Sequence, residues 1–278
     1  MADISRESLV TAVQAPLDRE RIYRGGILVF RQMPAMVALA AQARAMACDA
    51  FAPHAPTEAQ ASLDAAEFRT RAAALRRSFM RDARVRASFR AVIESLALDP
   101  AATYADRLIL RLQPGAATHR GRRMRDLPAH RDTWGSNLMA QINLWGPVFP
   151  VEAGATMVIW PALFDRAVPN TSAEWNLERL RGDPGRYPLL PECRAPLDDA
   201  AAVPVLIDPG DLLCFSGAHL HASRPNRTGR TRLSLDTRIV DQDDARAGRG
   251  PANVDGRAPR VVHEWFRSVA TGERLSPP

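Results

Sequence analysis

The order of apolar and polar positions divides the chain into regions with different periodicities. In residues 1–100 apolar side chains recur at helical intervals, which predicts one helix over 34–48 and another from Pro56 to Leu96. A short apolar run over 26–30 precedes both and predicts a strand. This part is therefore expected to form a mostly helical flank.

Residues 101–240 instead alternate between apolar and polar positions, with Pro and Gly at the breaks. Such alternation predicts strands, and several short strands separated by turn residues favour a sandwich or a barrel. The predicted strands cover residues 107–112, 137–145, 156–160, 203–207, 211–215 and 230–240. We therefore expect a mainly β fold with helical additions.

Two further segments do not fit a strand pattern. Residues 161–202 form a long irregular stretch, and loops of this length in a compact domain are usually functional. We expect this segment to cover the mouth of a binding site. Residues 241–278 form a polar tail rich in Gly, Pro and Arg, with one short helix predicted over 262–269.

The composition indicates a single domain. A chain of 278 residues with 46% hydrophobic content can bury one substantial core. No run approaches the roughly 20 consecutive apolar residues of a membrane helix, and the first ten residues lack a basic-then-apolar secretory pattern. We therefore expect a cytoplasmic protein without a membrane partner.

The three widely spaced cysteines argue against a disulfide framework and a zinc–thiolate site, and Cys214 suits a buried structural thiol.

The net charge of +6 arises entirely from arginine, because the sequence contains no lysine. These arginines are scattered among 31 acidic residues and few aromatics, which argues against a nucleic-acid-binding face. The densest stretch holds four arginines just before the first candidate metal ligand: Arg120, Arg122, Arg123 and Arg125. This position favours an electropositive mouth for an anionic substrate or co-substrate over a nucleic-acid contact, although a solvated loop is favoured over both for most of these arginines.

The residues with the clearest chemistry are His130, Asp132 and His221. Alternate residues of a strand point to the same side, so His130 and Asp132 could converge on one metal ion. A barrel could fold His221 back onto the same point. Two imidazoles and one carboxylate on one face of a metal leave the other face open, which suits an oxygen-activating iron(II) site.

A second pair of polar residues follows His221 and strengthens this interpretation. Arg232 and Ser234 lie on one side of the last predicted strand. A guanidinium fork with a neighbouring hydroxyl can hold a carboxylate. A His-x-Asp motif by itself is common, whereas its combination with a later histidine and a carboxylate clamp is much more specific.

Together these motifs resemble the iron(II)/2-oxoglutarate-dependent dioxygenases, and in particular their phytanoyl-CoA dioxygenase-like branch. The run from Asp211 to Phe215 also looks like the Gly-Asp-apolar-apolar-apolar-Phe strand of that family. The resemblance covers roughly residues 105–240 and is carried by the two metal motifs. It implies a double-stranded β-helix (jelly roll, or cupin-like barrel) flanked by N-terminal α-helices, with the metal inside one mouth.

The resemblance also implies a reaction. Iron(II) would be held by His130, Asp132 and His221, and O2 and 2-oxoglutarate would be the co-substrates. The far carboxylate of 2-oxoglutarate would bind Arg232 and Ser234. The expected outcome is hydroxylation of a small organic molecule, for which an anionic group is one option, with release of succinate and CO2. Halogenating relatives lack the carboxylate ligand, so the presence of Asp132 favours hydroxylation.

Several neighbouring residues have alternative interpretations. His219 could replace His221 as the third ligand, although the spacing to Arg232 favours His221. The amides of Gln141 and Asn143 could bind the 1-carboxylate of 2-oxoglutarate or could bond within a polar core.

Three candidates concern the substrate. Thr133 and Trp134 directly follow the ligand pair and could shape its pocket, although Trp134 could equally be part of the core. Arg238 lies on the same side of its strand as Arg232 and could meet an anionic substrate, but a structural ion pair is favoured.

Two alternatives share the metal ligands. A cupin-type metalloenzyme that does not use 2-oxoglutarate, or a metal-binding module without turnover, would not need Arg232. Nothing in the sequence indicates the oligomeric state.

Overall fold

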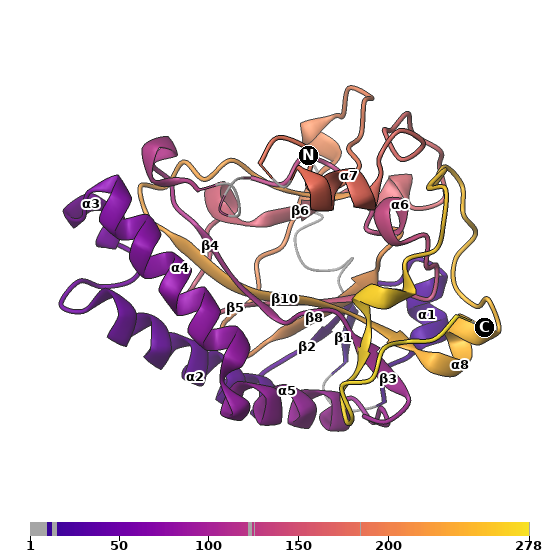
Figure 1. The fold of residues 1–278 in the computed structure, drawn as a ribbon, viewed down its shortest axis with the longest axis horizontal. Coiled ribbons are helices and arrows are strands. Elements are labelled where there is room, and N and C mark those ends of the chain that lie inside the picture. The colour runs from indigo at the N-terminus through magenta and orange to yellow at the C-terminus, as the bar shows by residue number, and fades with distance from the viewer. Residues whose placement is uncertain (1–9, 13–15, 122–123, 125, 184, 278) are drawn as a thin grey trace.

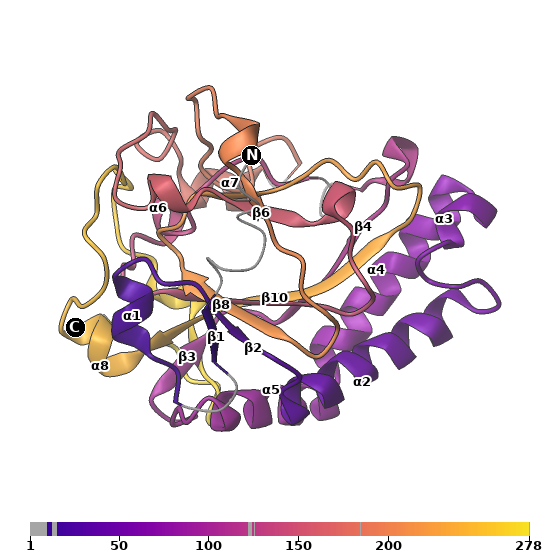
Figure 2. The same cartoon turned by 180° about the vertical axis from the view of Figure 1, so that it is seen from behind.

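The computed structural model describes residues 10–12, 16–121, 124, 126–183 and 185–277. Its centre is an eight-stranded sheet with helices packed on one face and a smaller, three-stranded sheet on the other (Figure 1). The helices α1 and α8 lie together at the end of the large sheet that is far from α3 (Figures 1 and 2).

The helices are concentrated before the sheet-forming region. The α-helices are α1 (Arg19–Tyr23), α2 (Pro34–Phe51), α3 (Ala59–Ser62), α4 (Ala65–Arg81), α5 (Ala83–Ser95), α6 (Thr133–Ser136), α7 (Leu177–Gly182) and α8 (Gln242–Arg246). Short 3-10 helices are η1 (Ala117–His119), η3 (Ala153–Ala155), η4 (Pro161–Leu163), η5 (Asp199–Ala201) and η6 (His263–Trp265).

The strands form two sheets that are antiparallel except for the β1–β2 pair. The strands are β1 (Val10–Ala12), β2 (Leu28–Phe30), β3 (Thr103–Ala105), β4 (Ile109–Gln113), β5 (Ile142–Pro147), β6 (Met157–Ile159), β7 (Val203–Pro204), β8 (Leu212–Ser216), β9 (His221–Ser223), β10 (Arg232–Asp241) and β11 (Arg267–Ser268). The large sheet has the order β1-β2-β8-β5-β10-β3-β11, with β4 also paired to β10, and the small sheet has the order β7-β6-β9.

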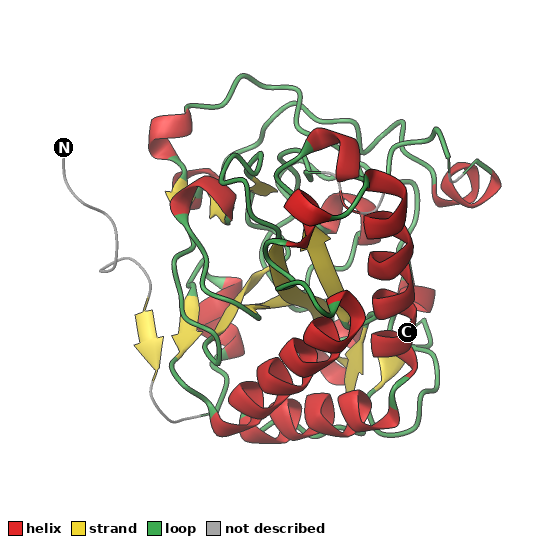
Figure 3. Ribbon diagram, turned by 90° about the vertical axis from the view of Figure 1, so that its left-hand side faces the viewer, coloured by secondary structure: helices red, strands yellow, loops and turns green. Residues whose placement is uncertain are grey.

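The single helix predicted from Pro56 to Leu96 is wrong, because two aspartates divide that stretch. The Asp64 carboxylate accepts hydrogen bonds from the first turn of α4, and Asp82 does the same for α5, at Arg84 N (2.7 Å). Such caps satisfy backbone N–H groups that the helix itself leaves unpaired. The resulting helices α4 and α5 pack together with α2 against the sheet (Figure 3).

Two other predicted elements differ from the structure. The strand expected over 137–145 begins only at Ile142, because α6 precedes it and Asn137 ends α6 in the left-handed conformation (φ 53°). The helix expected over 262–269 is instead the short η6 followed by β11, which pairs with β3. In both places tertiary contacts outweigh the local pattern.

The two faces of the large sheet have opposite character. On β10, Leu233 and Leu235 point to the helices and belong to the main apolar core, whereas Arg232 and Ser234 occupy the alternate positions. A second apolar core, which includes Trp145, lies between the two sheets. The inner face of β10 therefore directs polar side chains into the space between the sheets.

The predicted combination of antiparallel sheets with N-terminal helices is confirmed in outline. Helices contain more of the described residues than strands do, and the strands of the described region form two sheets without closing into a barrel. None of the helices in the described ranges is both long and apolar enough to span a bilayer.

A buried aspartate joins the end of β2 to the start of β8 in the large sheet. The Asp211 carboxylate accepts hydrogen bonds from the backbone N–H groups of Gln32 (2.9 Å) and Asp208 (3.0 Å), and from Arg31 Nη1 (2.6 Å). Burial alone would raise the pKa of Asp211, but these hydrogen bonds outweigh it and hold the pKa below its ordinary value.

Replacing Asp211 by Asn is expected to lower the free energy of unfolding at pH 7 by about 1–3 kcal/mol, because charge-assisted hydrogen bonds are lost. The lowered pKa means that this stabilisation is complete above the unfolded-state pKa and is lost as the pH falls through the folded-state pKa. Urea unfolding of both proteins from pH 7 to pH 3 should therefore show their difference shrinking. Asp208→Asn, at an exposed side chain, is the matched control, and equal losses in both variants would contradict the assignment.

Candidate metal centre

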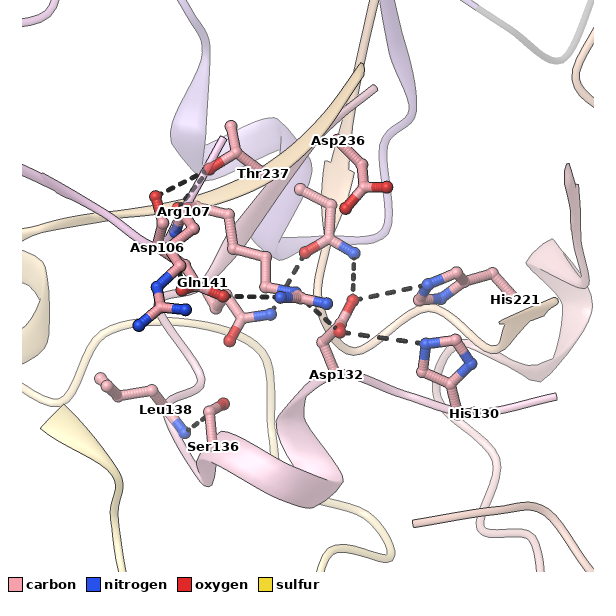
Figure 4. A network of polar contacts seen from close by, with 12 residues as sticks. Asp106, Arg107, His130, Asp132, Ser136, Leu138, Gln141, His221, Asp236 and Thr237 are labelled. Atoms are coloured by element: carbon pink, nitrogen blue, oxygen red, sulfur yellow. Dashed lines mark hydrogen bonds and ion pairs between the residues drawn. The ribbon is translucent and has the colours of Figure 1, made fainter. Parts of the chain in front are cut away.

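Three side chains from two separate segments come together between the two sheets. His130 and His221 exchange backbone hydrogen bonds of 2.9 and 3.0 Å, so the segment that carries His130 is held against β9. Asp132 Oδ1 lies 3.9 Å from His130 Nε2, and Asp132 Oδ2 lies 3.4 Å from His221 Nε2 (Figure 4). One ligand atom from each residue falls within 4.8 Å of the others, so the three could hold one metal ion.

The sequence suggested that a continuous strand brings His130 and Asp132 together. The structure shows a different backbone between them. His130 makes an isolated bridge, and Asp132 already has helical backbone angles (φ −64°, ψ −31°) as the residue before α6. The chain therefore turns from the bridge into a helix between the two residues. Both side chains still reach the same point, so the predicted pairing is retained with a different local geometry.

Both histidines present their Nε2 atoms to the centre of the site. His130 Nδ1 lies 2.8 Å from the Pro128 carbonyl and His221 Nδ1 lies 3.0 Å from the His219 carbonyl, so each Nδ1 is the donor. Burial, with repulsion from His221, lowers the pKa of His130 to about 3, and burial also lowers the pKa of His221. Neutral imidazoles with a free Nε2 are the form that binds metals.

The Asp132 carboxylate is buried but well compensated. Arg238 Nε donates to Asp132 Oδ1 (2.9 Å) and Asn143 Nδ2 donates to Asp132 Oδ2 (2.5 Å). Arg238 Nη1 also donates to Asp106 (2.7 Å), so two carboxylates share one guanidinium. Burial would raise the pKa of Asp132, yet Arg238 and the two histidines outweigh it and hold this pKa well below its usual value. Arg238 thus forms a structural ion pair, which the sequence analysis favoured over contact with an anionic substrate.

Arg232 lines a cavity that the triad also lines, and Ser234 lies two residues further along β10. Arg232 is 5% exposed, and its Nε and Nη1 atoms have no hydrogen-bond partner among the described residues. The Ser234 hydroxyl is buried and equally unpartnered there. Burial and the nearby charge of Arg111 lower the pKa of Arg232 to about 9. A buried, unpaired guanidinium is costly, so this arrangement calls for an anionic ligand.

The other candidates occupy less direct positions. Gln141 donates to Asn143 (3.2 Å) and leaves its own buried oxygen without a partner among the described residues. Trp134 is fully buried in an apolar cluster that includes Val158 of β6 and Ala222 of β9, and Thr133 is also buried. His219 is bonded to the Gly25 carbonyl (3.2 Å) through Nε2, outside the triad.

Two acidic residues that the sequence did not single out support the site. Asp106 anchors Arg238, and Asp255 accepts hydrogen bonds from Trp134 Nε1 (2.6 Å) and Arg131 Nε (3.2 Å). Each partner is more than 100 residues away in sequence. No local pattern could have identified either one, because both pairings depend on how the chain folds.

Arg131, between the two predicted ligands, ties the site to the segment 161–202. Its guanidinium donates to the carbonyls of Leu163 (2.7 Å) and Arg166 (2.7 Å) as well as to Asp255. Part of the same segment, including Trp175 and Leu190, lines a larger cavity that reaches Asp132. The expectation that this segment lies at the mouth of the site agrees with this position. Arg122, Arg123 and Arg125 lie outside the described residues.

Comparison with known proteins finds one matching family. Residues 189–234, which include His221, Arg232 and Ser234, match the model of the phytanoyl-CoA dioxygenase family. No curated protein matches the chain.

Solved structures resemble the fold at low sequence identity. A structure described as a non-heme monooxygenase, ThoJ in its apo form, is 20% identical over 81% of this chain and 77% of its own, with a TM-score of 0.50. EvdO2 from Micromonospora carbonacea var. aurantiaca, complexed with 2-oxoglutarate, is 15% identical over 59% of this chain and 62% of its own, with a TM-score of 0.40. The match over residues 189–234 confirms the predicted resemblance to the phytanoyl-CoA dioxygenase family, and ThoJ has a similar fold.

Proposed function

We propose that this protein is a non-haem iron(II)- and 2-oxoglutarate-dependent oxygenase that hydroxylates an organic molecule. His130, Asp132 and His221 are the metal ligands, and Arg232 with Ser234 binds the far carboxylate of 2-oxoglutarate. The family match over residues 189–234 and the fold shared with a non-heme monooxygenase support this proposal. We also interpret the two facing sheets as an incompletely closed jelly roll.

The observation that carries the proposal is the unpaired charge of Arg232. The guanidinium is buried in a cavity that is also lined by His130, Asp132 and His221, and Ser234 lies two residues further along the same strand face. A metal-binding module or a cupin enzyme without a 2-oxoacid co-substrate would have no use for a carboxylate clamp at this place. A dicarboxylate could bind the metal with one end and Arg232 with the other. It would then explain why the triad and an unpaired guanidinium line the same cavity.

The chemistry of the three ligands suits iron(II). Two neutral imidazoles and one carboxylate form the donor set typical of non-haem iron sites with open positions, and the buried His130 Nε2 has no other partner in the described structure. When bound, the metal would supply the site at which O2 is activated. The protein keeps each imidazole oriented through its Nδ1–H and keeps Asp132 ionised through Arg238 and Asn143.

The metal assignment predicts that His130→Ala and Asp132→Ala each abolish stoichiometric iron(II) binding, because each removes one of three ligands. Anaerobic equilibrium dialysis followed by metal analysis measures this directly. His263→Ala, at a histidine remote from the triad in sequence and absent from both cavities, is the matched control and should bind iron normally.

A second variant separates the two candidate third ligands. His219→Gln keeps a hydrogen-bonding side chain beside Gly25 and should retain iron, whereas His221→Gln should lose it. Iron binding that survives in His221→Gln and fails in His219→Gln would reverse the assignment.

The co-substrate assignment predicts that Arg232→Ala retains iron(II) and loses affinity for 2-oxoglutarate. Two charge-assisted hydrogen bonds are removed, so the loss should be on the order of 3–6 kcal/mol before any replacement by water. Anaerobic calorimetric titration of the iron-loaded protein measures it. Arg230→Ala, two residues earlier and paired at the surface with Glu58, is the control.

A comparison of ligands sharpens this test. 2-Oxobutyrate has the same chelating end as 2-oxoglutarate but lacks the far carboxylate. The native protein should prefer 2-oxoglutarate strongly, and Arg232→Ala should bind the two ligands about equally. A preference that is unchanged by the substitution would show that Arg232 does not hold the carboxylate.

A further inference from the structure

A second and much larger cavity adjoins the metal centre. It has a volume of about 1850 Å³, and its walls come from α4, α5, the segment between β3 and β4, residues 189–191 and the C-terminal region. Asp132, Arg238, Arg111 and Leu127 line both this cavity and the smaller one that contains the triad. The two cavities therefore meet at the metal-binding carboxylate.

The charge of the larger cavity is strongly one-sided. Its acidic residues are each paired with arginine, since Asp106 and Asp132 bind Arg238, and Glu264 binds Arg260 (2.7 Å). Other arginines line the cavity without an acidic partner among the residues that the structure describes: Arg81, Arg86, Arg107, Arg267 and Arg274. All five are exposed, so their charges lie on the open side of the cavity.

The same cavity offers an apolar surface beside these charges. Trp175 and Trp265 contact each other edge to face with ring centroids 6.2 Å apart, and both line the wall. Leu189, Leu190 and Leu108 extend this surface. A ligand with an aromatic or aliphatic body could therefore pack on these residues while its charged group stays near the arginines.

We propose that the larger cavity binds the substrate, and that the substrate is a bulky organic anion with an apolar body. Typical small-molecule sites measure about 300–1,000 Å³, so a cavity of 1850 Å³ suits a ligand larger than a simple metabolite. The anionic group lies against Arg107 and Arg274, and the apolar body packs near Trp265 and extends toward Asp132. The identification of this ligand as the molecule that is oxidised rests on the proposed function. Its binding to the larger cavity does not depend on that function.

A matched pair of fluorescent probes tests the proposal without catalysis. 8-Anilino-1-naphthalenesulfonate carries an aromatic body and a sulfonate, and N-phenyl-1-naphthylamine has the same body without the charge. In the full-length protein, the double variant Arg107→Gln/Arg274→Gln should weaken binding of the sulfonate about tenfold, because two partly exposed charge contacts are lost. Binding of the neutral probe should not change. Trp265→Leu should weaken both probes, because it removes apolar surface.

A control with the same change in net charge isolates the cavity from general electrostatics. Arg77→Gln/Arg84→Gln removes two exposed arginines from α4 and α5 that do not line the cavity, and it should leave both probes unaffected. The proposal would be overturned if the two double variants had equal effects. It would also be overturned if neither Arg107→Gln/Arg274→Gln nor Trp265→Leu changed the affinity for the sulfonate. Because the probes need neither iron nor 2-oxoglutarate, this result is independent of the tests on Arg232 and the triad.

Discussion

The inward face of β10 is the constraint on which the rest of the site depends. Arg232, Ser234, Asp236 and Arg238 alternate with residues that face the helical layer, so one strand must present four polar groups to the interior. Asp236 is paired with Arg111 (2.8 Å) from β4, and Arg238 is paired with Asp132 and Asp106. Arg232 alone keeps a buried charge without an anion among the described residues.

This distribution of partners explains how the strand can be stable and still be prepared for a ligand. A buried charge is tolerated when it is paired and hydrogen-bonded, and Arg238 meets that condition twice. Arg232 does not meet it, so part of the folding free energy is offset by an unsatisfied guanidinium. A bound carboxylate would remove that penalty, and co-substrate binding would therefore also stabilise the fold.

The environment of Asp132 links the candidate metal centre to distant parts of the chain. Arg238 brings the inner face of β10 to the carboxylate, and Asp106 fixes Arg238 from the end of β3. Arg131, the neighbour of Asp132, joins the same short segment to Asp255 and to the carbonyls around η4. The position of Asp132 is thus determined by the strand, the segment 161–202 and the C-terminal region together.

The sequence by itself was enough to select the residues of the candidate site. His130, Asp132, His221, Arg232 and Ser234 could be selected because their residue types and their order suit one chemistry, and the alternation along residues 230–240 correctly placed Arg232 and Ser234 on one strand face. The helix over 34–48 could be predicted because its apolar period is local.

Only the tertiary structure decided which of these groups are paired and which are free. The breaks at Asp64 and Asp82, the helix after Asp132 and the separation of His219 from the triad depend on caps and contacts that compete with local patterns. The pairing of Arg238 with Asp106, and the absence of a partner for Arg232 within the described residues, follow from strand register and burial. Sequence records the charges, but the free energy of each charge depends on the dielectric and the neighbours that the fold supplies around it.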